Sequence, residues 1–174
     1  MNRRLFIYSG VAVAAIAAGG YMYHARTSVN EGALSSADPG VILRALTLPD
    51  LEGTPQSMAQ WDGRPLVVNF WATWCAPCVK EMPELQMLQE KYPTIQFVGI
   101  GVDKVENMRQ FLQKVPVSYP LLVLGGNAVD MLRQLGNPTG GLPFTLLFNA
   151  DGTLSRKILG QIQVDDLDRS LKGL

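Results

Sequence analysis

From residue 66 onwards, short apolar runs alternate with stretches whose apolar residues recur at helical spacing. The apolar runs predict strands at 66–70, which is rich in β-branched residues, and at 95–102, 119–124 and 145–148; a further strand at 153–159 is expected as a hairpin partner. The amphipathic stretches predict helices at 76–89, 105–114, 128–135 and 164–171. In the last helix, three aspartates are expected to face solvent: Asp165, Asp166 and Asp168. The alternation predicts an α/β domain with helices packed against a sheet.

Turn signals between these runs predict how the strands pair. The sequence Asn149-Ala150-Asp151-Gly152 predicts an antiparallel hairpin between 145–148 and 153–159. The order strand 66–70, helix, strand 95–102 requires instead a parallel pair with a right-handed crossover. We therefore expect a central mixed β-sheet flanked by helices, with chemistry at the carboxyl edge of its parallel strands. Ahead of it, 41–48 and 56–58 predict a short N-terminal β-hairpin.

The N-terminus carries a long uncharged stretch. Arg3 and Arg4 precede nineteen residues, 5–23, without a charged side chain. As a helix this stretch covers roughly 28 Å, close to the bilayer's hydrocarbon thickness of about 30 Å. We therefore expect an N-terminal membrane anchor at 1–24, a flexible linker of small and polar residues at 25–40, and a folded domain at 41–174. The two arginines are expected on the cytoplasmic side of the membrane. The alternative is a cleaved signal peptide, because Ala15-Ile16-Ala17 is a small-x-small site.

The strand at 66–70 leads directly to a pair of cysteines. Cys75 and Cys78 flank Ala76 and Pro77, and Pro77 falls in the first turn of the helix at 76–89, where a missing N–H costs no intrahelical bond. Unpaired N–H groups and the positive end of the helix dipole favour a thiolate at Cys75. Cys78 lies on the same side, one turn further along the helix. It can close a disulfide with Cys75 or attack a mixed disulfide that Cys75 has formed.

Other uses of this cysteine pair fit less well. A structural zinc site needs four ligands, whereas the chain has two cysteines and one histidine, His24. Haem attachment needs a histidine where Val79 stands. A purely structural disulfide around two residues would constrain the unfolded chain little. Redox chemistry without a cofactor or metal is the prediction, and the balance of 15 basic and 15 acidic residues argues against a nucleic-acid partner.

Three segments together resemble a known family. Phe-Trp-Ala-Thr-Trp-Cys-Ala-Pro-Cys at 70–78, followed by Lys80-Glu81-Met82-Pro83, is similar to the thioredoxin superfamily, specifically its TlpA/ResA-like branch of membrane-anchored thiol-disulfide oxidoreductases. The segment Gly-Leu-Pro-Phe-Thr at 141–145 and the strand pair joined at Asp151-Gly152 agree in type and order. The resemblance extends from about residue 41 to the C-terminus. It implies a thioredoxin-like fold preceded by an N-terminal hairpin.

The resemblance also implies a set of site residues. It implies that the Leu142–Pro143 peptide bond is cis, that Pro143 packs beside a Cys75–Cys78 disulfide, and that Leu142 offers its backbone to a partner segment. The alternative is a trans proline at a strand edge. Further substrate contacts are expected from residues that flank or separate the cysteines: Trp74, Ala76 and Pro77.

Glu81 is the predicted proton acceptor for Cys78. It lies three residues beyond Cys78 on the same helical face and matches a glutamate that ResA-like proteins place near their active site. The alternative is a solvated Glu81 that pairs with a lysine such as Lys80. Asn69 stands where thioredoxin has a buried acid beneath the disulfide, so the usual proton carrier is missing.

The resemblance implies an exported reductase of disulfides in extracytoplasmic proteins such as apocytochrome c. Such a protein needs a membrane thiol-electron donor, and its location would be the bacterial inner membrane, crossed once, with the redox domain on the periplasmic side. The residues between Cys75 and Cys78 do not fix the direction of electron flow. A dithiol oxidase, a peroxidase and a non-catalytic binding module on a thioredoxin scaffold remain alternatives.

Overall fold

The structure is a computed structural model that describes residues 38–174. The predicted membrane anchor at 1–24 and all but the last few residues of the predicted linker lie outside this range. Within residues 38–174, no helix combines the length and apolar character needed to cross a bilayer.

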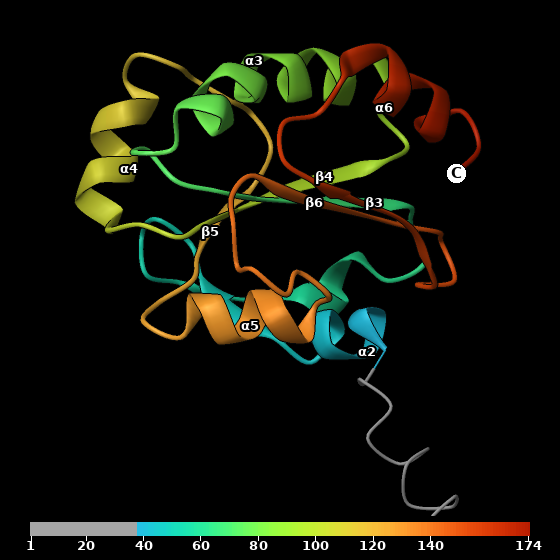
Figure 1. The fold of residues 1–174 in the computed structure, drawn as a ribbon, viewed down its shortest axis with the longest axis horizontal. Coiled ribbons are helices and arrows are strands. Elements are labelled where there is room, and N and C mark those ends of the chain that lie inside the picture. Colours follow the sequence, from blue (N-terminus) through green and yellow to red (C-terminus); the bar gives the residue numbers. More distant parts are fainter. Residues whose placement is uncertain (1–37) are drawn as a thin grey trace, which may run out of the picture. The chain divides into compact units, whose positions relative to one another are not determined.

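A five-stranded mixed sheet forms the centre of the domain (Figure 1). Its strands, in the order β5-β4-β3-β6-β7 across the sheet, are β5 Leu121–Val123, β4 Gln96–Gly101, β3 Leu66–Trp71, β6 Phe144–Phe148 and β7 Leu154–Leu159. β3 pairs in parallel with β4, and β4 with β5, whereas β6 runs antiparallel to both β3 and β7. The predicted mixed sheet is therefore confirmed, with β3 in the middle and buried along its whole length.

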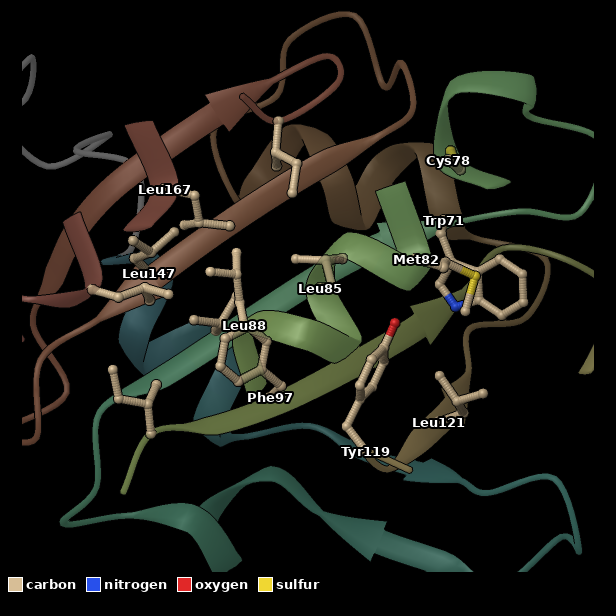
Figure 2. Packing of buried hydrophobic residues seen from close by; sticks show 14 of the residues in the cluster. Trp71, Cys78, Met82, Leu85, Leu88, Phe97, Tyr119, Leu121, Leu147 and Leu167 are labelled. Carbon is tan, nitrogen blue, oxygen red and sulfur yellow. The ribbon is translucent and has the colours of Figure 1, made fainter. Parts of the chain in front are cut away.

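Helices cover both faces of this sheet (Figure 1). One face packs against α3 Ala76–Lys91, α4 Val105–Leu112 and α6 Val164–Leu171, and the other against α5 Ala128–Gln134 and the short α2 Pro39–Arg44. Alternation along β3 divides its side chains between these layers, with Val67 and Trp71 towards α3 and Val68 and Phe70 towards α5. Figure 2 shows the α3 layer, where Met82, Leu85 and Leu88 lie on the sheet.

The N-terminal part of the domain differs from the expectation. Residues 39–44 form α2 rather than a strand, and the hairpin is reduced to β1 Thr47–Pro49 and β2 Pro55–Ser57, followed by the 3-10 helix η1 Met58–Trp61. The Asp38 carboxylate accepts a hydrogen bond from the Gly40 N–H at 2.8 Å, and Pro39 occupies the first turn. Of the apolar side chains in α2, only Leu43 is buried, whereas Val41 is 61% exposed. Burial on one side only fits a helical turn. A short apolar run does not by itself distinguish a helix from a strand.

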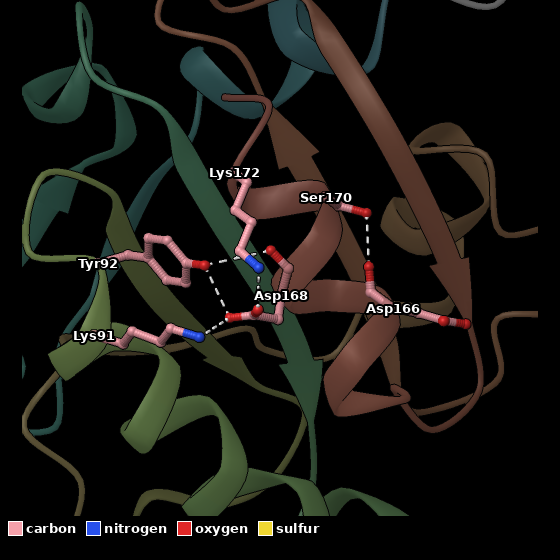
Figure 3. Close-up of polar contacts among 6 residues, drawn as sticks. All are labelled: Lys91, Tyr92, Asp166, Asp168, Ser170 and Lys172. Atoms are coloured by element: carbon pink, nitrogen blue, oxygen red, sulfur yellow. Dashed lines mark hydrogen bonds and ion pairs between the residues drawn. The ribbon is translucent and has the colours of Figure 1, made fainter.

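Asp168 is not a solvated residue as expected, because it joins α6 to the end of α3 (Figure 3). Its carboxylate accepts hydrogen bonds from Lys91 Nζ at 2.5 Å and from the Tyr92 hydroxyl at 2.8 Å, and pairs with Lys172 Nζ at 3.0 Å. These donors hold the pKa of Asp168 well below its usual range. The contact fixes α6 over the α3 face of the sheet.

Candidate active site

Cys75 and Cys78 form a disulfide at the start of α3, shortly after β3 ends. The S–S distance is 2.04 Å. Cys75 is the N-cap of α3, and its Sγ accepts a hydrogen bond from the Cys78 N–H at 3.3 Å. Cys75 is 6% exposed and Cys78 is 0% exposed. The helix therefore leaves a small part of Cys75 at the surface and covers Cys78, and the Cys78 N–H of the first turn is directed at Cys75 Sγ.

Glu81 lies one turn below Cys78 and is fully buried. Its Oε1 accepts a hydrogen bond from Asn69 Nδ2 at 2.7 Å, and its Oε2 accepts one from the Ile162 N–H at 2.9 Å. Burial raises the pKa of Glu81 to about 7, although these two hydrogen bonds oppose the rise; the negative charge of Glu84 adds to it. The alternative of a solvated Glu81 paired with Lys80 is wrong.

Two parts of the chain bind the Glu81 carboxylate, and a third contacts one of them. Asn69 on β3 lies opposite Thr145 on β6, and Asn69 Nδ2 also donates to the Thr145 hydroxyl at 3.0 Å. The loop between β7 and α6 binds Glu81 directly through the Ile162 N–H. The roles of Thr145 and Ile162 were not predicted. A signal for Thr145 was present, since it and Asn69 are polar residues in otherwise apolar buried strands.

Aromatic residues surround the buried side of this site. Trp71 is a core residue, fully buried, with its ring centroid 5.4 Å from that of Phe111. Tyr119 is also buried in this cluster, and Figure 2 shows its hydroxyl directed into the layer that holds Trp71 and Met82. Burial and the nearby Glu81 charge raise the pKa of the Tyr119 phenol above its usual range. Tyr119 therefore stays protonated near neutral pH, whereas Glu81, whose pKa is raised to about 7, titrates there.

Residues expected to contact a substrate occupy the surface around Cys75. Trp74 is 68% exposed, so most of its side chain faces solvent. Ala76 is exposed, while Pro77 and Leu142 are half-buried. Leu142 packs against the same apolar cluster that contains both cysteines.

The Leu142–Pro143 peptide bond is cis, and Pro143 is buried. The carbonyl of Pro143 accepts a hydrogen bond from the Gly160 N–H at 2.9 Å. Upstream, the buried Asn137 donates from Nδ2 to the Gly141 carbonyl at 2.7 Å, which fixes the loop directly before Leu142. The family resemblance implied this cis geometry, while the role of Asn137 was not predicted.

A comparison with family models matches residues 37–171 to Redoxin. The chain belongs to the Redoxin family. Its relatives include the thiol-disulfide oxidoreductase ResA of Geobacillus thermodenitrificans, with 28% identity over 181 residues, covering 99% of this chain and 97% of ResA. ResA of Bacillus subtilis is 29% identical over 170 residues, covering 91% of this chain and 87% of that protein.

Solved structures agree with this membership. A thioredoxin-related protein from Neisseria meningitidis serogroup B is 35% identical and has a TM-score of 0.65. The match covers 72% of this Redoxin-family chain and 96% of the Neisseria chain. A secreted Mycobacterium tuberculosis disulfide oxidoreductase homologous to E. coli DsbE is 26% identical, with a TM-score of 0.66. The match covers 76% of this chain and 98% of the Mycobacterium chain. The Redoxin-family chain is thus a thiol-disulfide oxidoreductase with a thioredoxin-like fold.

Proposed function

We propose that this chain is an exported reductase that transfers two electrons from the Cys75–Cys78 dithiol to disulfides of extracytoplasmic proteins. The main support for this proposal is the geometry of Cys75 and Cys78. The outer sulfur lies at the N-terminus of α3, and the inner sulfur is covered and lies one turn from a buried carboxylate. Such an arrangement suits a nucleophile followed by a resolving thiol.

In the first step, the Cys75 thiolate attacks one sulfur of the substrate disulfide. The substrate S–S bond breaks, a mixed disulfide forms, and the departing substrate thiolate takes a proton. The Cys78 thiolate then attacks Cys75 Sγ, which forms the intramolecular disulfide and releases the second substrate thiol. The substrate gains two electrons and two protons, and the enzyme is left oxidised.

Glu81 serves the second step in this proposal. Cys78 is buried, so its proton cannot pass directly to bulk water before it attacks. A carboxylate at i+3 with a pKa of about 7 can accept that proton near neutral pH, where it is still partly ionised.

The substrate segment is proposed to bind across the exposed surface formed by Trp74, Ala76 and Pro77 and to lie along Leu142 and Pro143. An exposed indole beside a reactive sulfur offers apolar contact area to an incoming chain. The fixed loop that ends at Gly141 holds the backbone of Leu142 ready for hydrogen bonds with an extended segment.

The uncharged stretch at 5–23, preceded by two arginines, supports a single-pass location in the bacterial inner membrane with the domain on the periplasmic side. An exported reductase must be re-reduced, so a membrane thiol-electron donor is the proposed partner. Apocytochrome c, whose cysteines must be reduced before haem attachment, is the proposed substrate among exported proteins.

The reduction potential of the Cys75–Cys78 pair tests the direction of transfer. We expect equilibration with glutathione buffers to give a potential near that of thioredoxin, about −270 mV. A value near that of DsbA, about −120 mV, would contradict the reductase and favour the dithiol oxidase. The separation of about 150 mV corresponds to roughly 7 kcal/mol for two electrons, so the two outcomes are well resolved.

A further inference from the structure

The loop that leads from β3 to Cys75 is bound by a carboxylate to which the redox cycle above gives no role. Asp103 Oδ2 accepts hydrogen bonds from the Thr73 N–H at 3.0 Å and from the Thr73 hydroxyl at 2.5 Å. Its other oxygen, Oδ1, accepts from the Lys104 N–H at 2.7 Å and from Asn107 Nδ2 at 2.8 Å. One side chain thus joins the loop before Cys75 to the start of α4.

The sheet register explains why these residues meet. β3 and β4 are parallel, with Trp71 opposite Gly101, so both chains leave the sheet at the same edge. The Val102 N–H donates to the Trp71 carbonyl at 2.8 Å, which continues the pairing one residue past β4. Thr73 and Asp103 then follow at equal distances along the two chains.

Asp103 ties the loop to a neighbouring element that is itself fixed in the core. Within the loop, the Cys75 N–H donates to the Ala72 carbonyl at 3.2 Å, which closes a local turn without fixing the turn against the sheet. Trp74 is 68% exposed and contributes little packing that could do so. Met108 of α4 is fully buried, so the Asp103 end of the contact is firmly placed.

We propose that Asp103 is a positioning residue for thiol-disulfide exchange. Its carboxylate holds Thr73 and Trp74 so that Cys75 Sγ stays at the N-terminus of α3 and the exposed indole stays beside it. This inference rests on the proposed function, because it concerns the same nucleophile. A small displacement of a reacting group can cost an enzyme orders of magnitude in rate.

Loss of Asp103 has two effects on Cys75 with opposite signs. Removing a negative charge near a thiolate lowers the pKa of the thiol. Letting Cys75 move away from the N–H groups of α3 raises that pKa. The direction of the change therefore separates a positioning role from a simple charge effect.

The test compares D103N, T73V and E106Q in the full-length reduced protein. Two quantities are measured: kcat/KM for reduction of insulin, and the pH profile of Cys75 alkylation by iodoacetamide. We expect D103N to lower kcat/KM about tenfold and to raise the pKa of Cys75. T73V, which removes the hydroxyl but no charge, should act in the same direction by a smaller factor. E106Q removes an exposed carboxylate of the same α4 turn and should change neither quantity.

The inference is overturned if D103N lowers the pKa of Cys75 with the insulin rate retained, or if it only lowers thermal stability and leaves the alkylation profile unchanged. If D103N does not fold, T73V decides, and an unchanged alkylation profile in T73V rejects the inference. If the unmodified protein does not reduce insulin, the proposed function fails, while the Cys75 titration still reports whether Asp103 positions the sulfur.

Discussion

Replacing Cys75 with serine is expected to abolish disulfide reduction, with a fall in kcat/KM of at least about a thousandfold. The reason is that Cys75 is the N-cap of α3 and is 6% exposed, whereas Cys78 is 0% exposed. A serine hydroxyl stays protonated at neutral pH and cannot form the mixed disulfide. Turbidity from insulin reduction with a thiol donor provides the measurement.

The matched variant C78S should fail at a different step. Its Cys75 can still attack a substrate disulfide, but no second thiol resolves the product, so a covalent complex with the substrate should accumulate. Non-reducing electrophoresis and mass spectrometry detect this complex. If C75S rather than C78S accumulated it, or if C75S retained the activity of the unmodified protein, the order of attack proposed for the two sulfurs would be wrong.

The second large effect is expected from E81Q. We expect release of substrate from the mixed disulfide to slow by about a hundredfold, because general acid-base groups typically contribute that much. In the unmodified protein this step should become faster as the pH rises through about 7, where Glu81 ionises, and E81Q should lack that inflection. Stopped-flow measurement of resolution across pH 5.5–9 tests both points.

The control for E81Q is E90Q, which removes an exposed carboxylate from the same helix and should leave the pH profile unchanged. An E81Q profile that matches the unmodified protein in both rate and inflection would show that Glu81 carries no proton in the cycle.

Glu81 should also give the unmodified protein a pH-dependent stability that E81Q lacks. Its pKa is raised in the folded state, so the folded chain binds more protons than the unfolded chain between pH 4.5 and about 7. The free energy of unfolding should therefore fall by about 3 kcal/mol as the pH rises through this window. Denaturant unfolding of the oxidised protein at both ends of the window measures the fall. In E81Q an NH2 group replaces one of the two carboxyl oxygens, so either Asn69 Nδ2 or the Ile162 N–H faces another donor, and this variant should be less stable at pH 4.5.

The central elements of the fold could be predicted from the sequence because their signals are local. The apolar run that becomes β3 and the Pro77 in the first turn of α3 identify the strand and helix that carry the cysteines. The turn at 149–152 identifies the β6–β7 hairpin in the same way. These features depend on residues a few positions apart, so pattern and turn chemistry suffice.

The features that were missed depend on contacts between distant segments. Asp168 looked like a solvated residue of an amphipathic helix until Lys91 and Tyr92 were placed against it. The buried environment of Glu81 likewise requires β6 and the loop at Ile162 to approach α3. The local spacing indicated that Glu81 is near Cys78, but only the three-dimensional structure raises its pKa by surrounding it with the core.

The proposed exchange cycle depends on the ionisation of Cys75, and one titration tests this directly. In the reduced protein, the rate of Cys75 alkylation as a function of pH gives the pKa of its thiol, with C78S as the background that removes the second sulfur. We predict a value below the ordinary cysteine value of about 8.5, because the N-terminus of α3 stabilises the thiolate. A value at or above about 8.5 would contradict the claim that the helix activates this sulfur.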